Sequence, residues 1–297
     1  MLEINKFVSL PQKHNMNYLD SFILPPENRQ VYPYKQMYEK GLEMIEFAPI
    51  TIFYGSNGSG KSTLLNVIAC KIGINNKTLG NTSEYFDGFV RKCTDASMNI
   101  PEDSMFIRSE DIMELIAGRR KKNASIDKTV KGWFAKGSDK SSKGTLEEQM
   151  YIQDEFENIY ENGAVTMNDS FYNVVKSKLF EKNDEESNGE TAIDYFKDRL
   201  FSDNLYFLDE PENSMSPALQ QELSNYICLL AYRLNSQFVI ATHSPFMLSM
   251  QGARIYNLDS HPSVTKEWWQ LDNMKVYYKL FERFSKKFNP DSISTQI

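Results

Sequence analysis

The sequence of 297 residues contains only three cysteines, and Cys70, Cys93 and Cys228 lie far apart. They form no Cys-x-x-Cys pair, so the pattern offers neither a zinc site nor a disulfide framework and fits a reducing compartment. No run of about 18 apolar residues occurs, which argues against a membrane-spanning helix. The first residues lack the apolar core of a secretion signal. We therefore expect a cytoplasmic protein.

An excess of basic residues is also missing, because the net charge is −7 at pH 7. The molecule as a whole is therefore not a basic nucleic-acid coat, although a local basic patch is compatible with this total. Aromatic residues make up 13% of the chain, which argues against global disorder. The length suits one large α/β domain with insertions or two small domains.

Strand-like and helix-like segments alternate along the chain, which predicts a mostly parallel sheet covered by helices. Residues 24–41 are rich in proline and tyrosine and are expected to be mostly loop. The predicted strands are 2–10, 42–47, 50–54, 205–208 and 237–241. The predicted helices are 63–69, 109–117, 146–160, 218–234 and 274–288, the last with Tyr277, Leu280, Phe281, Phe284 and Phe288 on one broad face.

A glycine-rich loop with the spacing Gly-x4-Gly-Lys-Ser stands between the predicted strand 50–54 and the helix that follows. In this Walker A pattern, backbone N–H groups and a helix N-terminus point at phosphates. The lysine is expected to reach the β and γ phosphates, and the serine hydroxyl to bind Mg²⁺. The candidate nucleotide-binding residues are Gly55, Ser56, Asn57, Gly58, Ser59, Gly60, Lys61, Ser62 and Thr63.

Two further apolar strands end in polar residues. Asp209 and Glu210 follow the strand 205–208, and His243 follows the strand 237–241. Because Mg²⁺ needs a carboxylate from a neighbouring strand, we expect Asp209 to bind the metal with Ser62. Glu210 is expected to polarise the attacking water, and His243 to contact the γ-phosphate. Lys61, Glu210 and His243 are thus the candidate catalytic residues.

These three segments together resemble the ABC class of P-loop ATPases, including its SMC-like branch. The resemblance extends to residues 211–217, which are similar to the D-loop, and to residues 186–190, which are similar to a degenerate LSGGE signature. A closer resemblance is to stand-alone bacterial ATPases of this class. It rests on FILPPE near Phe22, YPY at Tyr32, residues 105–110 and the block 209–256, so it covers most of the chain outside 118–185.

The resemblance implies a P-loop NTPase fold of the ABC type, with an N-terminal antiparallel β portion and a helical insertion. It implies one domain over residues 1–297, with a helical subdomain at about 75–190. It also implies that Ser187 and Gly189 act on ATP bound by the opposite subunit. The Q-loop glutamine is absent, and Arg108 or Glu110 could replace it. Tyr32, Tyr34 and Tyr38 are candidates for stacking on adenine, and ordinary packing is the alternative for each.

The expected function is hydrolysis of Mg·ATP by a homodimer that ATP holds together and that switches another process, such as defence against phage. The basic insertion at about 118–145 contains Trp133 and Phe134, and its segment 119–143 is a candidate nucleic-acid contact or a solvated loop. Alternatively, the chain regulates a nuclease or toxin effector, with the apolar C-terminal helix as a docking face. A soluble transporter subunit and a small-molecule kinase remain as further alternatives.

Overall fold

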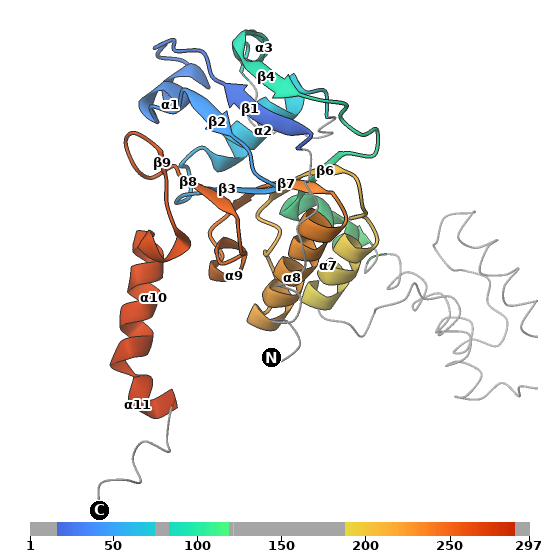
Figure 1. Ribbon diagram of the computed structural model, residues 1–297, viewed down its shortest axis with the longest axis vertical. Coiled ribbons are helices and arrows are strands. Elements are labelled where there is room, and N and C mark those ends of the chain that lie inside the picture. Colours follow the sequence, from blue (N-terminus) through green and yellow to red (C-terminus); the bar gives the residue numbers. More distant parts are fainter. Residues whose placement is uncertain (1–16, 75–82, 119–120, 122–187, 289–297) are drawn as a thin grey trace, which may run out of the picture. The chain divides into compact units, whose positions relative to one another are not determined.

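The computed structural model describes residues 17–74, 83–118, 121 and 188–288 (Figure 1). The chain divides into two compact units. The first combines Met1–Ser109 with Ile193–Ile297, and the second is Glu110–Ala192. The helical subdomain was predicted to begin near residue 75, but residues 83–109 belong to the first unit. Most of the predicted insertion lies outside the described residues, as do the predicted strand 2–10 and the predicted helix 146–160.

A six-stranded sheet forms the centre of the first unit. Its strand order is β5-β6-β7-β3-β8-β9; the first five strands are mutually parallel, and β9 pairs antiparallel with β8. The α/β fold with a mostly parallel sheet is therefore confirmed. The strands are β3 (Ile50–Tyr54), β5 (Met105–Arg108), β6 (Leu205–Asp209), β7 (Gln237–Thr242), β8 (Arg254–Asn257) and β9 (Val264–Thr265).

The three central strands carry nearly continuous apolar sequences because both faces of the sheet are covered. Every residue of β3, β6 and β7 is buried. Figure 1 shows α8 (Pro217–Arg233) and α9 (Pro245–Leu248) on one side of the sheet. On the other side lies α2 (Lys61–Lys71), which packs against β6 and β7.

A second, antiparallel sheet of three strands has the order β2-β1-β4, and it confirms the expected N-terminal antiparallel portion. Its strands are β1 (Leu19–Ile23), β2 (Met44–Glu46) and β4 (Thr94–Ser97), and the helices of this region are α1 (Tyr34–Glu39) and α3 (Phe86–Lys92). The prediction of mostly loop at 24–41 was wrong over α1. This six-residue helix has no side-chain cap, but Tyr34 and Met37 are buried, so tertiary packing stabilises it.

The predicted C-terminal helix is present but interrupted. After the short 3₁₀ helix η2 (Trp268–Gln270), α10 (Asp272–Arg283) ends before Phe284, and α11 (Ser285–Phe288) follows. A further helix, α7 (Asn188–Lys197), begins in the second unit and ends in the first. Within the described part of the chain, no helix is both long and apolar enough to span a membrane.

Candidate functional site

Three parallel strands bring the candidate residues to one edge of the sheet. Strand β7 pairs with β3 through Tyr54 opposite Thr242, and with β6 through Asp209 opposite Ala241. The carboxyl ends of β3, β6 and β7 therefore meet at this edge, where loops of parallel sheets usually bind ligands. Asp209 was expected on the strand next to β3. This was wrong in one respect, because β7 lies between β3 and β6.

The glycine-rich loop folds into a tight turn between β3 and α2. The Ser59 N–H donates to the Ser56 carbonyl at 3.0 Å. A Cβ atom on Gly55 would lie 2.4 Å from Ser59 Oγ and 2.8 Å from Ser59 Cβ, so this close approach requires glycine. Gly60 precedes α2 with a φ of 98°, which favours glycine as well. The loop is thus closed tightly at the N-terminus of α2, where the sequence predicts that phosphate binds.

Lys61 is only 4% exposed and lies inside the curve of this loop. Its Nζ donates to the carbonyl oxygens of Gly55 at 2.8 Å and Ser56 at 3.3 Å. The same ammonium lies 3.8 Å from Glu210 Oε1. A positive charge is therefore held between the loop and the carboxylate that follows β6.

Ser62, in the first turn of α2, contacts Asp209 at the end of β6. Ser62 Oγ donates to Asp209 Oδ1 at 3.1 Å, and Asp209 is 7% exposed. A hydroxyl and one carboxylate are hard oxygen donors, which suit Mg²⁺ when substrate phosphates and water complete its coordination. Among the described residues, no cluster of three or more His, Cys, Asp or Glu side chains could hold a metal without such help. The donors present therefore fit a magnesium ion that arrives with a phosphate ligand.

Glu210 stands at the turn that follows β6. Its φ is 49°, and its N–H donates to the Ala241 carbonyl at 2.9 Å. The left-handed backbone turns the side chain out of the strand, where it is 27% exposed. His243 Nδ1 lies 3.9 Å from Glu210 Oε1, and Asn213 Nδ2 donates to Glu210 Oε2 at 3.1 Å. The hydrogen bond from Asn213 thus holds Glu210 Oε2, while Oε1 faces the nitrogen atoms of Lys61 and His243.

Glu212 joins the turn after β6 to the turn after β7. Its Oε1 accepts a short hydrogen bond from Thr242 Oγ1 and a longer one, at 3.3 Å, from the His243 N–H. The side chain is 5% exposed, and burial raises the pKa of this carboxyl, although the hydrogen bond from Thr242 acts in the opposite direction. Glu212 therefore fixes the backbone that carries His243.

The segment around α1 contacts the glycine-rich loop and the first turn of α2. Tyr32 Oη donates to Thr63 Oγ1 at 3.2 Å, and Gln36 Nε2 donates to the Gly58 carbonyl at 3.2 Å. The third predicted tyrosine candidate, Tyr34, is 2% exposed and makes an edge-to-face contact with Phe89. Of the three tyrosines proposed to stack on adenine, Tyr34 is core packing, Tyr32 contacts the loop, and Tyr38 is 47% exposed.

An acidic residue that the sequence analysis did not select holds the start of the same loop. Both carboxylate oxygens of Asp259, which follows β8, accept from the Ser56 N–H at 2.9 and 3.0 Å, and Oδ1 also accepts from Ser56 Oγ at 2.9 Å. Neither Asp259 nor Gln36 belongs to a recognisable pattern, so no sequence signal identifies them. Glu212 and Asn213 lie directly after Asp209-Glu210, and that position was the available signal.

The remaining predictions concern the second unit or the edge strand. Ser187 lies outside the described residues, and Gly189 is buried in the first turn of α7. Arg108, at the end of β5, donates to Asn66 Oδ1 of α2 at 3.0 Å, and Glu110 belongs to the second unit. The roles of these four residues stay predictions.

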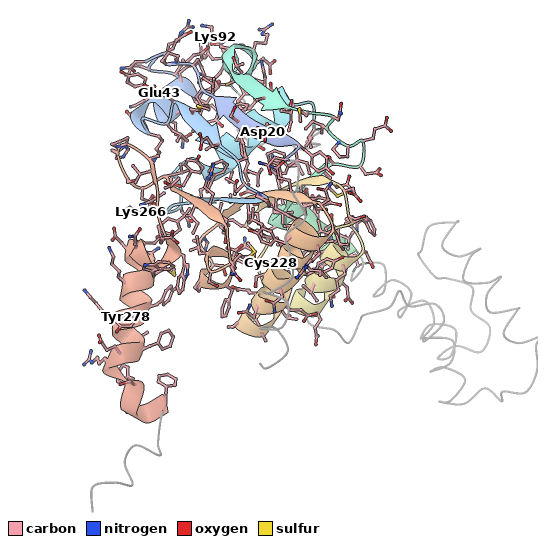
Figure 2. The ribbon with its side chains drawn as sticks, in the orientation of Figure 1. Asp20, Glu43, Lys92, Cys228, Lys266 and Tyr278 are labelled. Carbon is pink, nitrogen blue, oxygen red and sulfur yellow. The ribbon has the colours of Figure 1, made fainter. Side chains whose placement is uncertain are left out.

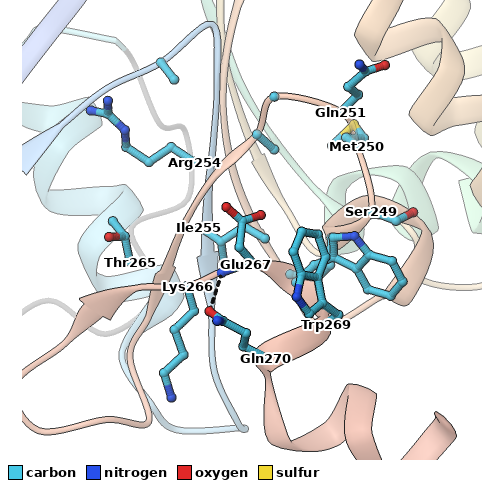
Figure 3. A pocket seen from close by; sticks show the side chains of 15 residues that line it. Ser249, Met250, Gln251, Arg254, Ile255, Thr265, Lys266, Glu267, Trp269 and Gln270 are labelled. Carbon is cyan, nitrogen blue, oxygen red and sulfur yellow. Dashed lines mark hydrogen bonds between the residues drawn. The ribbon is translucent and has the colours of Figure 1, made fainter.

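A separate hollow of about 830 Å³ lies beside β8 and contains none of the candidate residues (Figure 3). It is lined by Ala48, by residues 248–255 and by residues 265–270, and its walls include Trp268 and Trp269. The two indole rings stand nearly perpendicular, with centroids 6.0 Å apart.

Comparison with known proteins identifies one family, which is described as "AAA domain, putative AbiEii toxin, Type IV TA system" and matches residues 119–249. Comparison with curated proteins found no match. Among solved structures, the SMC head domain from Thermotoga maritima is 12% identical, with 84% of this chain and 99% of that chain covered and a TM-score of 0.37.

Two further solved structures are similar. The Smc head domain of Pyrococcus furiosus, bound to the C-terminal domain of ScpA, is 15% identical over 89% of this chain and 99% of that chain, with a TM-score of 0.39. A nucleotide-free ATP-binding cassette from an ABC transporter is 14% identical over 72% of this chain and 80% of that chain, with a TM-score of 0.34.

Proposed function

We propose that this ABC-class P-loop ATPase domain binds Mg·ATP at the carboxyl edge of its parallel sheet and hydrolyses the γ-phosphate. The observation that carries the proposal is the convergence of Lys61, Ser62 and Glu210 at that edge. Lys61 Nζ lies 3.8 Å from Glu210 Oε1, and Ser62 Oγ lies 3.1 Å from Asp209 Oδ1. A cation, a metal-binding pair and a carboxylate are the groups that phosphoryl transfer to water requires.

Each residue has a distinct role in this proposal. The N–H groups at the start of α2 and the Lys61 ammonium bind phosphate oxygens. Ser62 and Asp209 hold Mg²⁺, which when bound neutralises charge on the phosphates. Glu210 accepts a hydrogen bond from the attacking water and draws its proton, while Asn213 keeps the carboxylate oriented. His243, 3.9 Å from Glu210, is placed to contact the transferred phosphoryl group.

We also propose that two copies close on two ATP molecules, with Ser187 and Gly189 acting across the interface. The support is the resemblance of residues 186–190 to the class signature. In such a dimer ATP controls a conformation, because closure depends on a ligand that hydrolysis destroys. The process that closure switches is then a protein effector, such as a nuclease or toxin, or a nucleic acid bound by residues 119–143. The description of the matched family favours a toxin-related or defence role.

The decisive experiment uses Glu210→Gln in the full chain. We expect ATP binding to persist and hydrolysis to fall by at least about a hundredfold, which corresponds to a barrier about 2.7 kcal/mol higher. Light scattering on the monomeric form of this variant, with and without Mg·ATP, is expected to show an ATP-dependent doubling of mass that Ser187→Arg abolishes. Glu222→Gln is the matched control, because that glutamate lies on α8 and pairs with Lys197 at the surface.

The two parts of the proposal fail separately. Hydrolysis at the wild-type rate in Glu210→Gln would contradict the assignment of the catalytic carboxylate. A monomer whose mass stays unchanged despite tight ATP binding would contradict the trans role of Ser187 while leaving hydrolysis in place. A metabolite phosphorylated only when Lys61 is intact would identify a kinase instead.

A further inference from the structure

Residues 272–288, which comprise α10, Phe284 and α11, carry an unusual amount of exposed apolar surface. Seven large apolar side chains of this segment are at least 37% exposed, and Tyr278 and Phe288 reach 65%. In Figure 1 the segment extends away from the sheets, and Figure 2 marks Tyr278 on it. The seven side chains are those of Val276, Tyr277, Tyr278, Leu280, Phe281, Phe284 and Phe288.

These side chains follow a heptad pattern. The spacing of 3, 4, 3 and 4 residues places four of them, together with the buried Met274, on one line along the helix, as the a and d positions of a coiled coil. The ring centroids of Phe281 and Phe288 lie 5.9 Å apart, so the line continues past the interruption at Phe284. We call this line the aromatic stripe; it consists of Met274, Tyr277, Phe281, Phe284 and Phe288.

Most charged residues of α10 lie away from the aromatic stripe, whereas Arg283 and Lys287 lie over the Phe284 ring, each 5.5 Å from its centroid. Lys275, Lys279 and Glu282 fall at the b and f positions, on the opposite side of the helix. The positions that flank the stripe in its first heptad, e and g, hold Tyr278 and Leu280. In this first heptad, an apolar seam of four positions with charge behind it is typical of a helix packed in a bundle.

The base of the segment is fixed to the domain. Leu271 and Met274 are 0% and 4% exposed, and Glu267 and Gln270 exchange the two hydrogen bonds of a capping box just before α10. After Met274, the stripe residues are 37–65% exposed within the described part of the chain. A helix of 12 residues is marginal by itself in water, so its stability requires that its apolar face be buried.

We propose that the aromatic stripe binds the same stripe of a second copy, forming a dimer that does not depend on ATP. Two-fold pairing places identical aromatic side chains against one another and leaves Lys275, Lys279 and Glu282 in solvent. Each aromatic ring offers about 150–250 Å² when fully covered, so the exposed part of the segment reaches several hundred Å² per copy. That area approaches the roughly 800 Å² per partner of a stable interface.

The test measures the mass of the nucleotide-free full chain by light scattering, over about a hundredfold range of protein concentration. We expect a dimer for the wild type, and Phe281→Glu with Phe284→Glu is expected to halve the mass. Val276→Glu is the matched control, since Val276 is 65% exposed but lies off the stripe, and it is expected to leave the dimer intact. Thermal unfolding of the dilute proteins checks that the substitutions leave the domain folded.

This dimer and the proposed ATP-held dimer are separable. Lys61→Ala is expected to keep the stripe dimer, and Glu210→Gln in the Phe281→Glu, Phe284→Glu background is expected to double its mass only with Mg·ATP. A monomeric wild type, or a double variant that keeps the wild-type mass, overturns the inference. A monomer that sediments with vesicles of phosphatidylglycerol and phosphatidylcholine, and loses this binding in the double variant, assigns the stripe to a lipid surface and overturns it as well.

Discussion

The side-chain amide of Asn213 lies 3.1 Å from Glu210 Oε2 and 3.1 Å from Ser109 Oγ. Asn213 therefore fixes one oxygen of the proposed catalytic carboxylate and ties it to the end of β5. The other oxygen stays 3.8 Å from Lys61 Nζ and 3.9 Å from His243 Nδ1. Orientation of this carboxylate depends on a residue that does not touch the phosphate-binding loop.

Replacing Asn213 by alanine is expected to lower kcat for ATP hydrolysis about tenfold, because a hydrogen bond to a charged group contributes about 1.5–3 kcal/mol. KM for ATP should stay close to the wild-type value, since the loop and Lys61 are unchanged. Steady-state kinetics measure both. Asn225→Ala is the control, because Asn225 is an exposed residue of α8 that accepts from Gln221. A rise in KM with unchanged kcat would contradict a positioning role.

Glu212→Gln is expected to stabilise the protein at pH 8 and to have no such effect near pH 4. Burial raises the pKa of the Glu212 carboxyl above its ordinary value of 4.5 in the folded state. The folded protein therefore binds this proton more tightly than the unfolded chain, so stability falls as the pH rises above 4.5. Glutamine accepts the same hydrogen bonds from Thr242 and His243 without ionising.

Thermal unfolding of Glu212→Gln and wild type across this pH range measures the effect, and we expect a Tm a few degrees higher at pH 8. Glu222→Gln serves as the exposed counterpart and should leave the pH profile unchanged. A Tm below that of the wild type at pH 8 would show that the ionised carboxylate is the stabilising form.

Gly55→Ala is expected to abolish ATP binding, and Ser59→Gly in the same chain is expected to restore part of it. The added methyl group would meet Ser59 Oγ at 2.4 Å and Ser59 Cβ at 2.8 Å, and such overpacking costs about 1–3 kcal/mol. Ser59→Gly alone removes no hydrogen bond within the described residues, because Ser59 Oγ is buried without a partner there. Titration with a fluorescent ATP analogue measures binding, and absence of rescue would mean that the methyl group acts through another contact.

The buried Cys93 and the half-buried Cys228 are expected to resist alkylation in the folded protein. Burial raises the pKa of Cys93 to about 12 and that of Cys228 to about 11. At pH 8 the reactive thiolate of Cys93 is then about a thousandfold rarer than for a thiol of pKa 9. Mass spectrometry after iodoacetamide treatment measures the rates, with the protein in guanidinium as the control. Equal rates in both conditions would contradict the packing around the end of α3, where Cys93 lies, and around α8, which contains Cys228.

Local sequence was sufficient for the central part of the fold. The runs 50–54, 205–208 and 237–241 are apolar throughout, and they became β3, β6 and β7 because such runs suit a sheet covered on both faces. From Gly55 to Ser62, the spacing of glycine, lysine and serine is one that few structures other than a phosphate-binding loop require. The prediction was wrong at α1, because six residues with no cap carry little helical signal of their own.

The sequence alone therefore predicts which residues bind phosphate and metal, since these lie within short segments whose spacing is set by chemistry. Which partners hold those residues was decided by the tertiary structure. Asp259 reaches Ser56 across 203 positions of sequence, and Tyr32 reaches Thr63 only because a loop folds back over α2. Such contacts follow from the order of strands and the packing of layers, and no local pattern of residues records them.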